Sequence, residues 1–258
     1  MSCGSTIIKA NKDYWTNRAA SYSDVNKYEL ENSVNQWSEV TYSNIDSAIN
    51  LPREEIKVLD IGTGPGFFAT ILARGGYNVT AIDLTPNMLK EAKANVGEYV
   101  DRINFMEMNA EELSFEDEAF HVVISRNLTW DLPHPEKAYS QWTRVIKKRG
   151  LLLNFDANWY NYLYYDEAKE AFKKDKAVSK ELNFDQEKDG VKYSDMEEIA
   201  KKIPLSSIIR PAWDKEILSQ LGMNVVADTS IWEKVWTEKE RLSYASTPLF
   251  LIKATKNA

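Results

Sequence analysis

Near residue 56 the chain changes character, and short apolar runs begin to alternate with amphipathic segments. Runs such as 56–62 (IKVLDIG) and 78–83 (NVTAID) are rich in β-branched residues and bounded by turn residues, which is typical of buried strands. Between the runs, apolar residues recur with helical spacing, and one helix is expected to start at Thr85 with Pro86 in its first turn. Strands are predicted at 56–62, 78–83, 103–109, 121–127, 151–157, 224–231 and 249–256, and helices at 66–77, 85–100, 135–150 and 214–222.

This order of elements predicts an α/β fold: a doubly wound, mostly parallel seven-stranded sheet with helices on both faces. The Rossmann-like domain is expected to comprise residues 51–158 and 213–258. Residues 1–50 are polar and aromatic and are predicted to form a helical lid. Residues 159–212 carry a tyrosine cluster and a charged helical stretch, and are predicted to be a cap inserted after the fifth strand. Lid and cap would enclose a pocket at the carboxyl edge of the sheet, where open α/β sheets bind ligands.

Composition and charge narrow the class of protein. The 258 residues carry a formal net charge of -7, which disfavours a nucleic-acid partner because such proteins need a basic face to neutralise phosphates. The basic run 147–149 is expected to be a solvated turn. One cysteine and two histidines cannot build a structural zinc site, so no metal is expected. Neither a signal peptide nor a membrane-spanning run is predicted, and we expect a cytoplasmic protein. The sequence carries no signal of oligomeric state.

A glycine-rich turn follows the first predicted strand, in the sequence VLDIGTGPG. Glycines let the backbone turn tightly and approach a ligand closely. The spacing is GxGxG, and Phe67 stands where a dinucleotide fingerprint has its third glycine. The negative charge of Asp60 suits a cofactor that bears an ammonium and a sulfonium, and would repel a pyrophosphate. The predicted ligand contacts in this segment are Asp60, Gly62, Thr63, Gly64 and Gly66.

Two further segments extend this site at the ends of the next two strands. Asp83 can accept hydrogen bonds from both hydroxyls of a ribose, and Leu84 and Met88 would offer apolar faces to an adenine ring. After the third strand, the Asn109 side-chain oxygen could accept from the adenine amino group, and the Ala110 N–H could reach a ring nitrogen. The predicted adenosine contacts are Asp83, Leu84, Met88, Asn109, Ala110 and Glu111.

On these motifs the chain resembles the class I, Rossmann-like S-adenosylmethionine-dependent methyltransferases, in the ubiquinone/menaquinone-methyltransferase-like branch. The resemblance covers about residues 56–156: VLDIGTGPG is similar to the first motif, AIDLTPNML to the ribose and adenine segment, and NAEELSF to the adenine loop. It implies S-adenosyl-L-methionine as cofactor, S-adenosyl-L-homocysteine as product and a small-molecule methyl acceptor. Asn109 departs from the usual Asp, and Lys148-Arg149 depart from the usual Pro-Gly.

The N-terminal segment also resembles a lid of this branch, through Tyr14-Trp15-x-x-Arg18-Ala19-x-x-Tyr22. The resemblance implies that Arg18 pairs with the methionine carboxylate of the cofactor and that Tyr14 or Tyr22 closes over it. Plain packing of these aromatic rings is the alternative. Asn127, after the fourth strand, is assigned to both the cofactor and the acceptor.

Methyl transfer from a sulfonium is an in-line displacement that needs alignment and desolvation, and a general base only where the acceptor loses a proton. The candidate bases are His134, in a Pro-flanked loop, and Asp156, at the end of the fifth strand. Each has a plainer alternative, an exposed loop histidine and a loop-capping carboxylate. The candidate acceptor contacts are Asn127, Trp130, Trp159, Tyr160, Arg210 and Trp213. The rings could equally form the core of the cap.

Two rival classes of protein stay open at this point. One is a nicotinamide-dependent oxidoreductase, which the GxGxG spacing and Asp60 disfavour. The other is a non-catalytic module that binds adenosylmethionine. Nothing in the sequence distinguishes an O, N, S or C acceptor.

Overall fold

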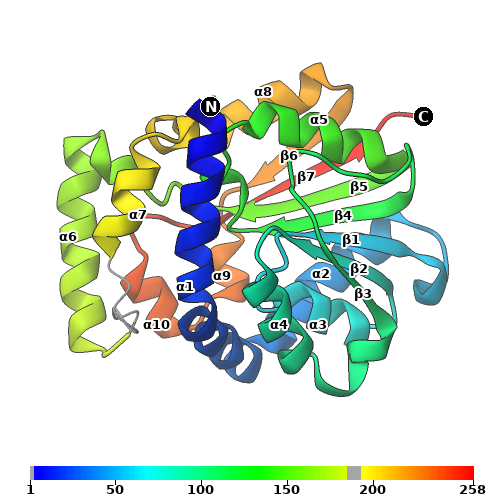
Figure 1. The fold of residues 1–258 in the computed structure, drawn as a ribbon, viewed down its shortest axis with the longest axis horizontal. Helices are drawn as coiled ribbons and strands as arrows, with labels where there is room; N and C mark the ends of the chain where they lie inside the picture. Colours follow the sequence, from blue (N-terminus) through cyan, green and yellow to red (C-terminus); the bar gives the residue numbers. More distant parts are fainter. Residues whose placement is uncertain (1–2, 185–192) are drawn as a thin grey trace.

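The computed structural model describes residues 3–184 and 193–258, and in this part of the chain seven strands form one sheet (Figure 1). The strand order is β3-β2-β1-β4-β5-β7-β6, and β7 runs antiparallel to both of its neighbours. The predicted mostly parallel, doubly wound sheet is therefore confirmed. The strands are β1 (Lys57–Ile61), β2 (Asn78–Asp83), β3 (Ile103–Glu107), β4 (Phe120–Arg126), β5 (Ile146–Asp156), β6 (Met223–Asp228) and β7 (Phe250–Lys256).

Helices cover both faces of the sheet because successive strand residues point to opposite sides. Val58 packs into the cluster formed with α2 (Val34–Ala48), α3 (Phe67–Arg74) and α9 (Trp232–Val235). The next residue, Leu59, packs into the cluster formed with α5 (Pro135–Val145) and α8 (Ala212–Gln220) on the other face. Continuous apolar strands are thus buried from both sides, as parallel sheets require.

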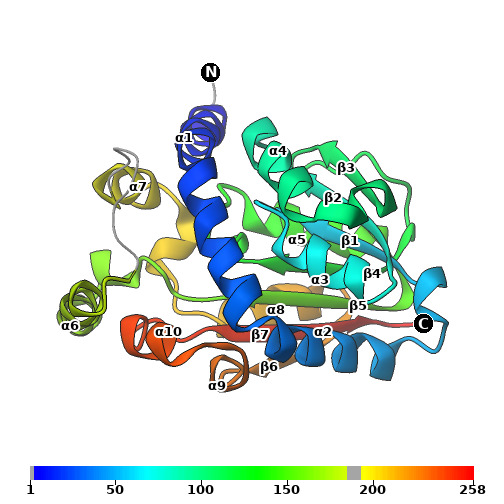
Figure 2. The ribbon, with the colours of Figure 1, turned by 90° about the horizontal axis from the view of Figure 1, so that it is seen from below.

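Beyond the carboxyl ends of the parallel strands lie the segments that the sequence leaves outside the alternation. The long helix α1 (Cys3–Asn32) crosses this edge and packs on α4 (Pro86–Asn95). Figures 1 and 2 show α6 (Asp166–Glu181), α7 (Tyr193–Ala200) and α10 (Glu238–Ser243) on the far side of α1 from the sheet. Residues 185–192 of the predicted cap lie outside the described residues. The 3-10 turns are η1 (Arg53–Glu55), η2 (Gly97–Arg102), η3 (Thr129–Asp131), η4 (Asn161–Leu163) and η5 (Pro204–Ser207).

The basic run 147–149 differs from the prediction of a solvated turn. The helix α5 ends at Val145 and β5 already begins at Ile146, so the run belongs to the strand. The pairing of β4 with β5 shifts register between Phe120 and Val122, and Arg149 adopts a positive φ of 60°. The strand absorbs extra residues at this point, and a local irregularity replaces the turn.

Neither a membrane span nor a metal cluster occurs in the described part of the chain. No helix there is long and apolar enough to cross a membrane. No group of three or more His, Cys, Asp or Glu side chains among the same residues could hold a metal ion.

Candidate active site

The glycine-rich turn connects β1 to α3 in a conformation that only glycine adopts readily. The φ angles are 53° at Gly64 and 90° at Gly66. A Cβ on Gly66 would lie 3.1 Å from the Cα of Ala92 in α4, whereas Gly64 lies against the ring of Tyr22. Gly66 therefore permits close packing of α3 against α4, and Gly64 faces the open side of the turn.

Two buried carboxylates flank this turn. Asp60 is 2% exposed and accepts a 2.6 Å hydrogen bond from the Thr63 hydroxyl. Asp83 accepts from the Gly64 N–H at 2.9 Å and the Thr85 N–H at 2.8 Å, one bond to each carboxylate oxygen. Burial raises the pKa of Asp60 to about 7, and the nearby Asp83 contributes to the rise. Burial also raises the pKa of Asp83. Two acids held in so little water favour a cationic or hydroxyl-rich ligand between them.

These groups line a cavity that we call the strand-end pocket. It lies at the carboxyl ends of β1 and β2 and beside the loop after β3, and α1 closes its outer side. Asn26 of α1 is 1% exposed, and neither its side-chain nitrogen nor its oxygen has a hydrogen-bond partner. Asp131 Oδ1 is also buried without a partner. The residues that define the pocket include Asn11, Trp15, Tyr22, Asn26, Asp60, Gly62, Thr63, Gly64, Asp83, Leu84, Met88, Asn109, Ala110, Asn127 and Asp131.

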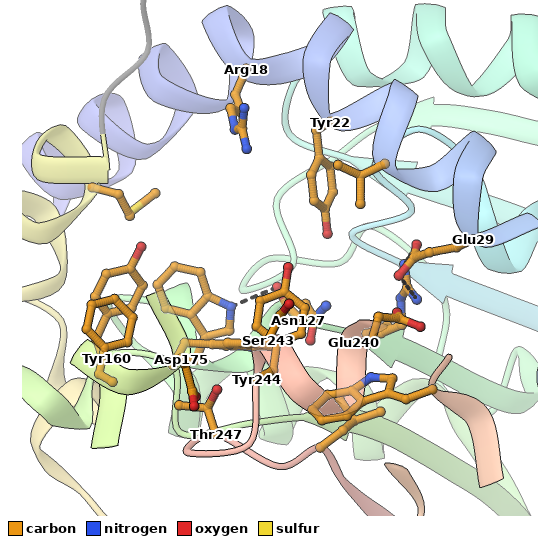
Figure 3. A pocket seen from close by; sticks show the side chains of 18 of the residues that line it. Arg18, Tyr22, Glu29, Asn127, Tyr160, Asp175, Glu240, Ser243, Tyr244 and Thr247 are labelled. Atoms are coloured by element: carbon orange, nitrogen blue, oxygen red, sulfur yellow. Dashed lines mark hydrogen bonds and ion pairs between the residues drawn. The ribbon is translucent and has the colours of Figure 1, made fainter. Parts of the chain in front are cut away.

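A second cavity, the aromatic pocket, adjoins the first (Figure 3). Among its described lining residues, eleven are aromatic. Trp130 stacks on Tyr160 with ring centroids 5.0 Å apart, and Tyr162 stacks on Phe172 at 3.8 Å. The rings are Tyr14, Trp15, Tyr22, Trp37, Trp130, Trp159, Tyr160, Tyr162, Phe172, Trp236 and Tyr244, and further lining residues include Arg18, Glu29, Arg126, Asn127, Asp175, Glu240 and Ser243.

The two cavities share a wall formed by Trp15, Tyr22, Arg126 and Asn127. Asn127 follows β4 with a positive φ of 54°, and its side-chain oxygen is buried without a hydrogen-bond partner. Burial raises the pKa of the Tyr22 phenol, so the hydroxyl stays protonated near neutral pH. A group that passes between the cavities must pass these side chains.

Two adjacent strips along one side of α1 serve the two cavities, because side chains three, four and seven positions apart share one side of a helix, and Trp15 and Tyr22 line both cavities. Asn11, Trp15 and Asn26 line the strand-end pocket. Tyr14 and Arg18 line the aromatic pocket instead. Tyr14 and Arg18, which the sequence assigned to the cofactor, thus line the aromatic pocket and not the strand-end pocket.

At Arg126, Glu29 and Glu240, the charge of the aromatic pocket is largely neutralised. Arg126 forms a two-pronged ion pair with Glu29, with bonds of 3.1 and 2.7 Å, and its guanidinium lies 3.8 Å from the Phe67 ring centroid. Burial raises the pKa of Glu240 to about 7, and the Glu29 carboxylate adds to the effect. Thr237 fixes Glu240 through its N–H and hydroxyl. Arg126, Glu29 and Glu240 form the floor of the pocket, which is therefore polar but close to neutral in charge at pH 7.

The structure brings most of the predicted site residues together. The residues on the strand-end pocket are Tyr22, Asp60, Gly62, Thr63, Gly64, Asp83, Leu84, Met88, Asn109, Ala110 and Asn127. Those on the aromatic pocket are Tyr14, Arg18, Tyr22, Asn127, Trp130, Trp159 and Tyr160. Gly66, Glu111, His134, Asp156, Arg210 and Trp213 line neither cavity.

Asp156 and Arg210 lie outside the two cavities. They form a buried ion pair, so neither charge is left for a ligand. Both side chains are at most 1% exposed, and Arg210 forms ion pairs of 2.6 Å with Asp156 and 2.5 Å with Asp214. Asp156 also accepts from the Trp130 N–H, which anchors the loop after β4. Trp213 stacks on Tyr139 at 5.7 Å, within the core cluster that α5 and α8 form with the sheet. These residues fix the frame of the site and line neither of the two cavities.

His134 and Glu111 likewise have structural positions. His134 is the exposed N-cap residue of α5. Its backbone N–H donates to the Glu111 side chain at 2.8 Å, so the buried Glu111 caps the helix end. The prediction of His134 as a base loses its basis, because the imidazole lines neither cavity.

Sequence reasoning missed the ion pair of the aromatic pocket and the contribution of α10. A signal for the pair was present, because Glu29 lies seven residues after Tyr22 on one side of α1 and Arg126 ends an apolar strand. The residues Glu240, Ser243 and Tyr244 come from the connection between β6 and β7. Nothing in their local sequence indicates which cavity they reach.

Comparison with known proteins agrees with this geometry. Residues 59–154 match the family model described as "Methyltransferase domain". The ubiquinone/menaquinone biosynthesis C-methyltransferase UbiE of Zymomonas mobilis is 33% identical over 100 residues, which cover 38% of this chain and 41% of that protein. The chain thus spans less than half the length of the first curated relatives that it matches. Residues 59–154 therefore match a methyltransferase domain, and the relatives and the motif residues at the strand ends support the class I, S-adenosylmethionine-dependent kind.

Solved structures share the fold at low identity. The phosphoethanolamine N-methyltransferase 2 of Haemonchus contortus, in complex with S-adenosylhomocysteine, has a TM-score of 0.57 at 17% identity, and covers 84% of this chain and 53% of that one. The (4+2)-cyclase SpnF has a TM-score of 0.54 at 16% identity, with coverage of 86% and 82%. The fold thus occurs in proteins named for different reactions, and the activity has to be argued from the site.

Proposed function

We propose that this protein transfers a methyl group from S-adenosylmethionine to a small molecule held in the aromatic pocket. The observation that carries the proposal is the pair of adjoining cavities with a shared wall at Tyr22 and Asn127. One cavity has the carboxylates and the glycine turn suited to a cationic nucleoside, and the other has the ring surfaces suited to an organic acceptor.

The residues of the strand-end pocket fit S-adenosylmethionine. Asp83 keeps lone pairs for the ribose hydroxyls while the Gly64 and Thr85 N–H groups hold it in place. Leu84 and Met88 offer apolar contacts to adenine, with Asn109 and Ala110 beside them. Asn109 Oδ1 already accepts a 3.0 Å hydrogen bond from the Glu111 N–H. Its second lone pair would therefore accept from the adenine amino group.

The methionine end of the cofactor would lie toward α1. The unpartnered amide of Asn26 and the free oxygen of Asp131 are polar groups that a zwitterionic amino acid can satisfy. Asp60 adds a buried carboxylate under the glycine turn. Unsatisfied buried polar atoms are costly, so their concentration at one end of the cavity supports a polar ligand group there.

S-adenosylmethionine supplies an electrophilic methyl group on its sulfonium. Tyr22, Asn127 and Trp15 form the wall where acceptor and donor meet, and their work is to exclude water and align the two. Asn127 Oδ1 can orient an acceptor N–H or O–H as a hydrogen-bond acceptor. Direct alignment requires no general base when the acceptor is already nucleophilic.

Binding of S-adenosylhomocysteine tests the cofactor assignment. At a hundredfold excess over its dissociation constant it should raise the free energy of unfolding by about 2.7 kcal/mol, and NAD under the same conditions should leave the melting temperature unchanged. Mass spectrometry of ligand released from the purified protein offers an independent view. Stabilisation by NAD alone would assign the chain to the nicotinamide enzymes.

Turnover needs its own measurement, since a binding module would pass the first test. Incubation with S-adenosylmethionine and a panel of small aromatic acceptors should release S-adenosylhomocysteine with at least one of them. A variant with Tyr22→Phe keeps the ring but loses the hydroxyl at the wall, and should change the rate more than the cofactor affinity. If the cofactor binds tightly but no acceptor raises the release of S-adenosylhomocysteine above the control without acceptor, the protein is a non-catalytic binding module.

Access to both cavities makes α1 the proposed lid. The helix lies over the two pockets, and the cofactor must pass it to enter. Amide hydrogens of residues 11–29 should exchange faster in the free protein than with S-adenosylhomocysteine bound. Helix α8, which lines neither cavity, is the internal control. Equal exchange of α1 with and without ligand would make it a permanent part of the core.

A further inference from the structure

Arg18 stands apart from the other buried arginines of the chain. Its residue is 7% exposed, and its guanidinium donates a 3.0 Å hydrogen bond to the neutral Ser21 hydroxyl one turn along the same helix. Among residues 3–184 and 193–258, no ion pair joins Arg18 to a carboxylate. By contrast, Arg126 pairs with Glu29, and Arg210 pairs with two aspartates. A buried guanidinium without an acid partner is unfavourable unless a ligand supplies the negative charge.

The orientation of Arg18 indicates which ligand that is. Figure 3 shows its guanidinium pointing from α1 into the aromatic pocket, toward the space between Tyr160 and Asn127. The residue lines this cavity and not the strand-end pocket, where the carboxylate of the cofactor would lie. Tyr22 at the shared wall is one helical turn further along α1, a rise of about 6 Å. Arg18 is therefore placed to bind the far end of the acceptor.

Other polar atoms of the pocket point to the same ligand chemistry. Ser243 is 3% exposed and its hydroxyl has no hydrogen-bond partner, and the indole N–H of Trp159 is buried without an acceptor. The acidic groups, in contrast, are already engaged: Glu29 by Arg126, Glu240 by Thr237, and Asp175 by the Ser246 N–H at 2.8 Å. The described part of the lining thus offers unused donors, and Arg18 is a buried guanidinium there without an ion-pair partner.

We infer that the methyl acceptor is a small aromatic or otherwise planar carboxylate, whose anionic group binds Arg18 while its reacting atom faces Tyr22 and Asn127. This inference rests on the proposed function, because it takes the ligand of the aromatic pocket to be the methyl acceptor. The ring surfaces between the two ends supply apolar contact. A guanidinium binds a carboxylate with two parallel hydrogen bonds, which fixes the direction in which the acceptor lies.

Matched ligand pairs test the charge requirement on the full chain. The probes are phenylacetate, 3-phenylpropionate and indole-3-acetate, each compared with its neutral amide, by calorimetry with and without S-adenosylhomocysteine. We expect at least one acid to bind about tenfold or more tightly than its amide. The Arg18→Met variant should lose that preference, and Arg18→Lys should keep part of it. A wild-type protein that prefers no acid over its amide overturns the inference.

Two further measurements separate this role from the alternatives. S-adenosylhomocysteine should bind Arg18→Met and the wild type within about twofold, whereas a tenfold loss would assign Arg18 to the cofactor. The Lys27→Gln variant removes one positive charge from an exposed position on the same helix, and should leave the acid preference unchanged. Because Arg18 has no acid partner among the described residues, the ligand-free Arg18→Met protein should melt no lower than the wild type. A drop of several degrees would reveal a structural role.

Failure of the proposed function would look different. In that case S-adenosylhomocysteine would not bind, while the acid preference and its dependence on Arg18 could still be measured in its absence. An acid preference that survives Arg18→Met would place the anion elsewhere, even in a protein that binds the cofactor normally.

Discussion

The two cavities are built in different ways. The strand-end pocket takes its main groups from three short segments that follow β1, β2 and β3, and backbone N–H groups hold its key carboxylate, Asp83. The aromatic pocket takes side chains from α1, α2, α6, α7 and α10, from Trp236 after α9, and from the loops after β4 and β5. Its polar floor is joined by an ion pair between residues 97 positions apart in the chain.

This difference explains how the two halves of the site respond to change. A pocket made by backbone turns depends on a few φ angles and on close packing of helices, which glycine alone permits. A pocket made by distant side chains depends on tertiary contacts. Removing one partner of a buried ion pair leaves the other charge uncompensated and destabilises the fold. The predictions below separate these two modes of construction.

The ion pair of the aromatic pocket should show the largest effect. Arg126→Met leaves Glu29 buried without its partner, and should lower the free energy of unfolding by about 3–5 kcal/mol. The double variant Arg126→Met with Glu29→Met should be less destabilised than Arg126→Met alone, since no uncompensated charge remains. Urea unfolding of both variants measures this. Simple addition of the two single effects would mean that the residues act independently.

Glycine packing on the cofactor side should follow in size. Gly66→Ala places a Cβ 3.1 Å from the Ala92 backbone at a φ of 90°, while Gly76→Ala has a similar φ of 86° and nothing within 4 Å. The positive φ should cost each variant about 1–2 kcal/mol. Overpacking should add about 1–3 kcal/mol for Gly66→Ala alone. Thermal unfolding that gives equal losses for the two would show that α4 can move aside.

Asp83 tests the ribose assignment of the strand-end pocket. Asp83→Ala should weaken S-adenosylhomocysteine binding by about 1.5–3 kcal/mol, because hydrogen bonds to a charged group are lost. Asp83→Asn should lose less, since one acceptor oxygen remains. Calorimetry at pH 8 gives both values, and circular dichroism checks the fold. Unchanged affinity in both variants would remove Asp83 from the cofactor site.

The pH dependence of binding should be the smallest effect. Burial raises the pKa of Asp60 to about 7 in the ligand-free protein, so the group is protonated below that pH. A cationic cofactor favours the carboxylate, so its bound-state pKa should be lower. Affinity for S-adenosylmethionine should then fall by up to about tenfold per pH unit below 7, and level off above it.

The Asp60→Asn variant provides the control for this profile, because it cannot ionise and should flatten the slope below pH 7. The folding stability of the ligand-free protein should depend on pH in the opposite direction to the cofactor affinity. A carboxyl with a raised folded-state pKa stabilises the fold at acid pH, and this contribution is lost as the pH rises through about 7. Calorimetric titration from pH 5.5 to 8.5 measures the binding profile, and a slope that survives Asp60→Asn would assign it to another acid.

Much of the fold and of the strand-end pocket could be predicted because their signals are local. The alternation of strands and helices follows from periodic burial, and the GxGxG turn with Asp60 and Asp83 is a pattern of adjacent residues. The strand ends must meet at one edge once the sheet is parallel. Asp156 and Arg210 were misjudged for the opposite reason. Asp156 was placed at the end of the fifth strand and Arg210 among the acceptor contacts, but their ion pair joins residues 54 positions apart, which no local pattern reveals.

By itself, then, the sequence determined the sheet, the class of domain and the residues of the glycine turn, because hydrophobic periodicity and glycine spacing act over a few residues. The tertiary structure decided which residues of α1 line which cavity, and it places Arg18, an expected cofactor contact, on the aromatic pocket. It also decided which charges are paired. Glu29 neutralises Arg126 and leaves Arg18 without an acid in the described part of the chain, and the packing of α1 across the sheet edge fixes that choice.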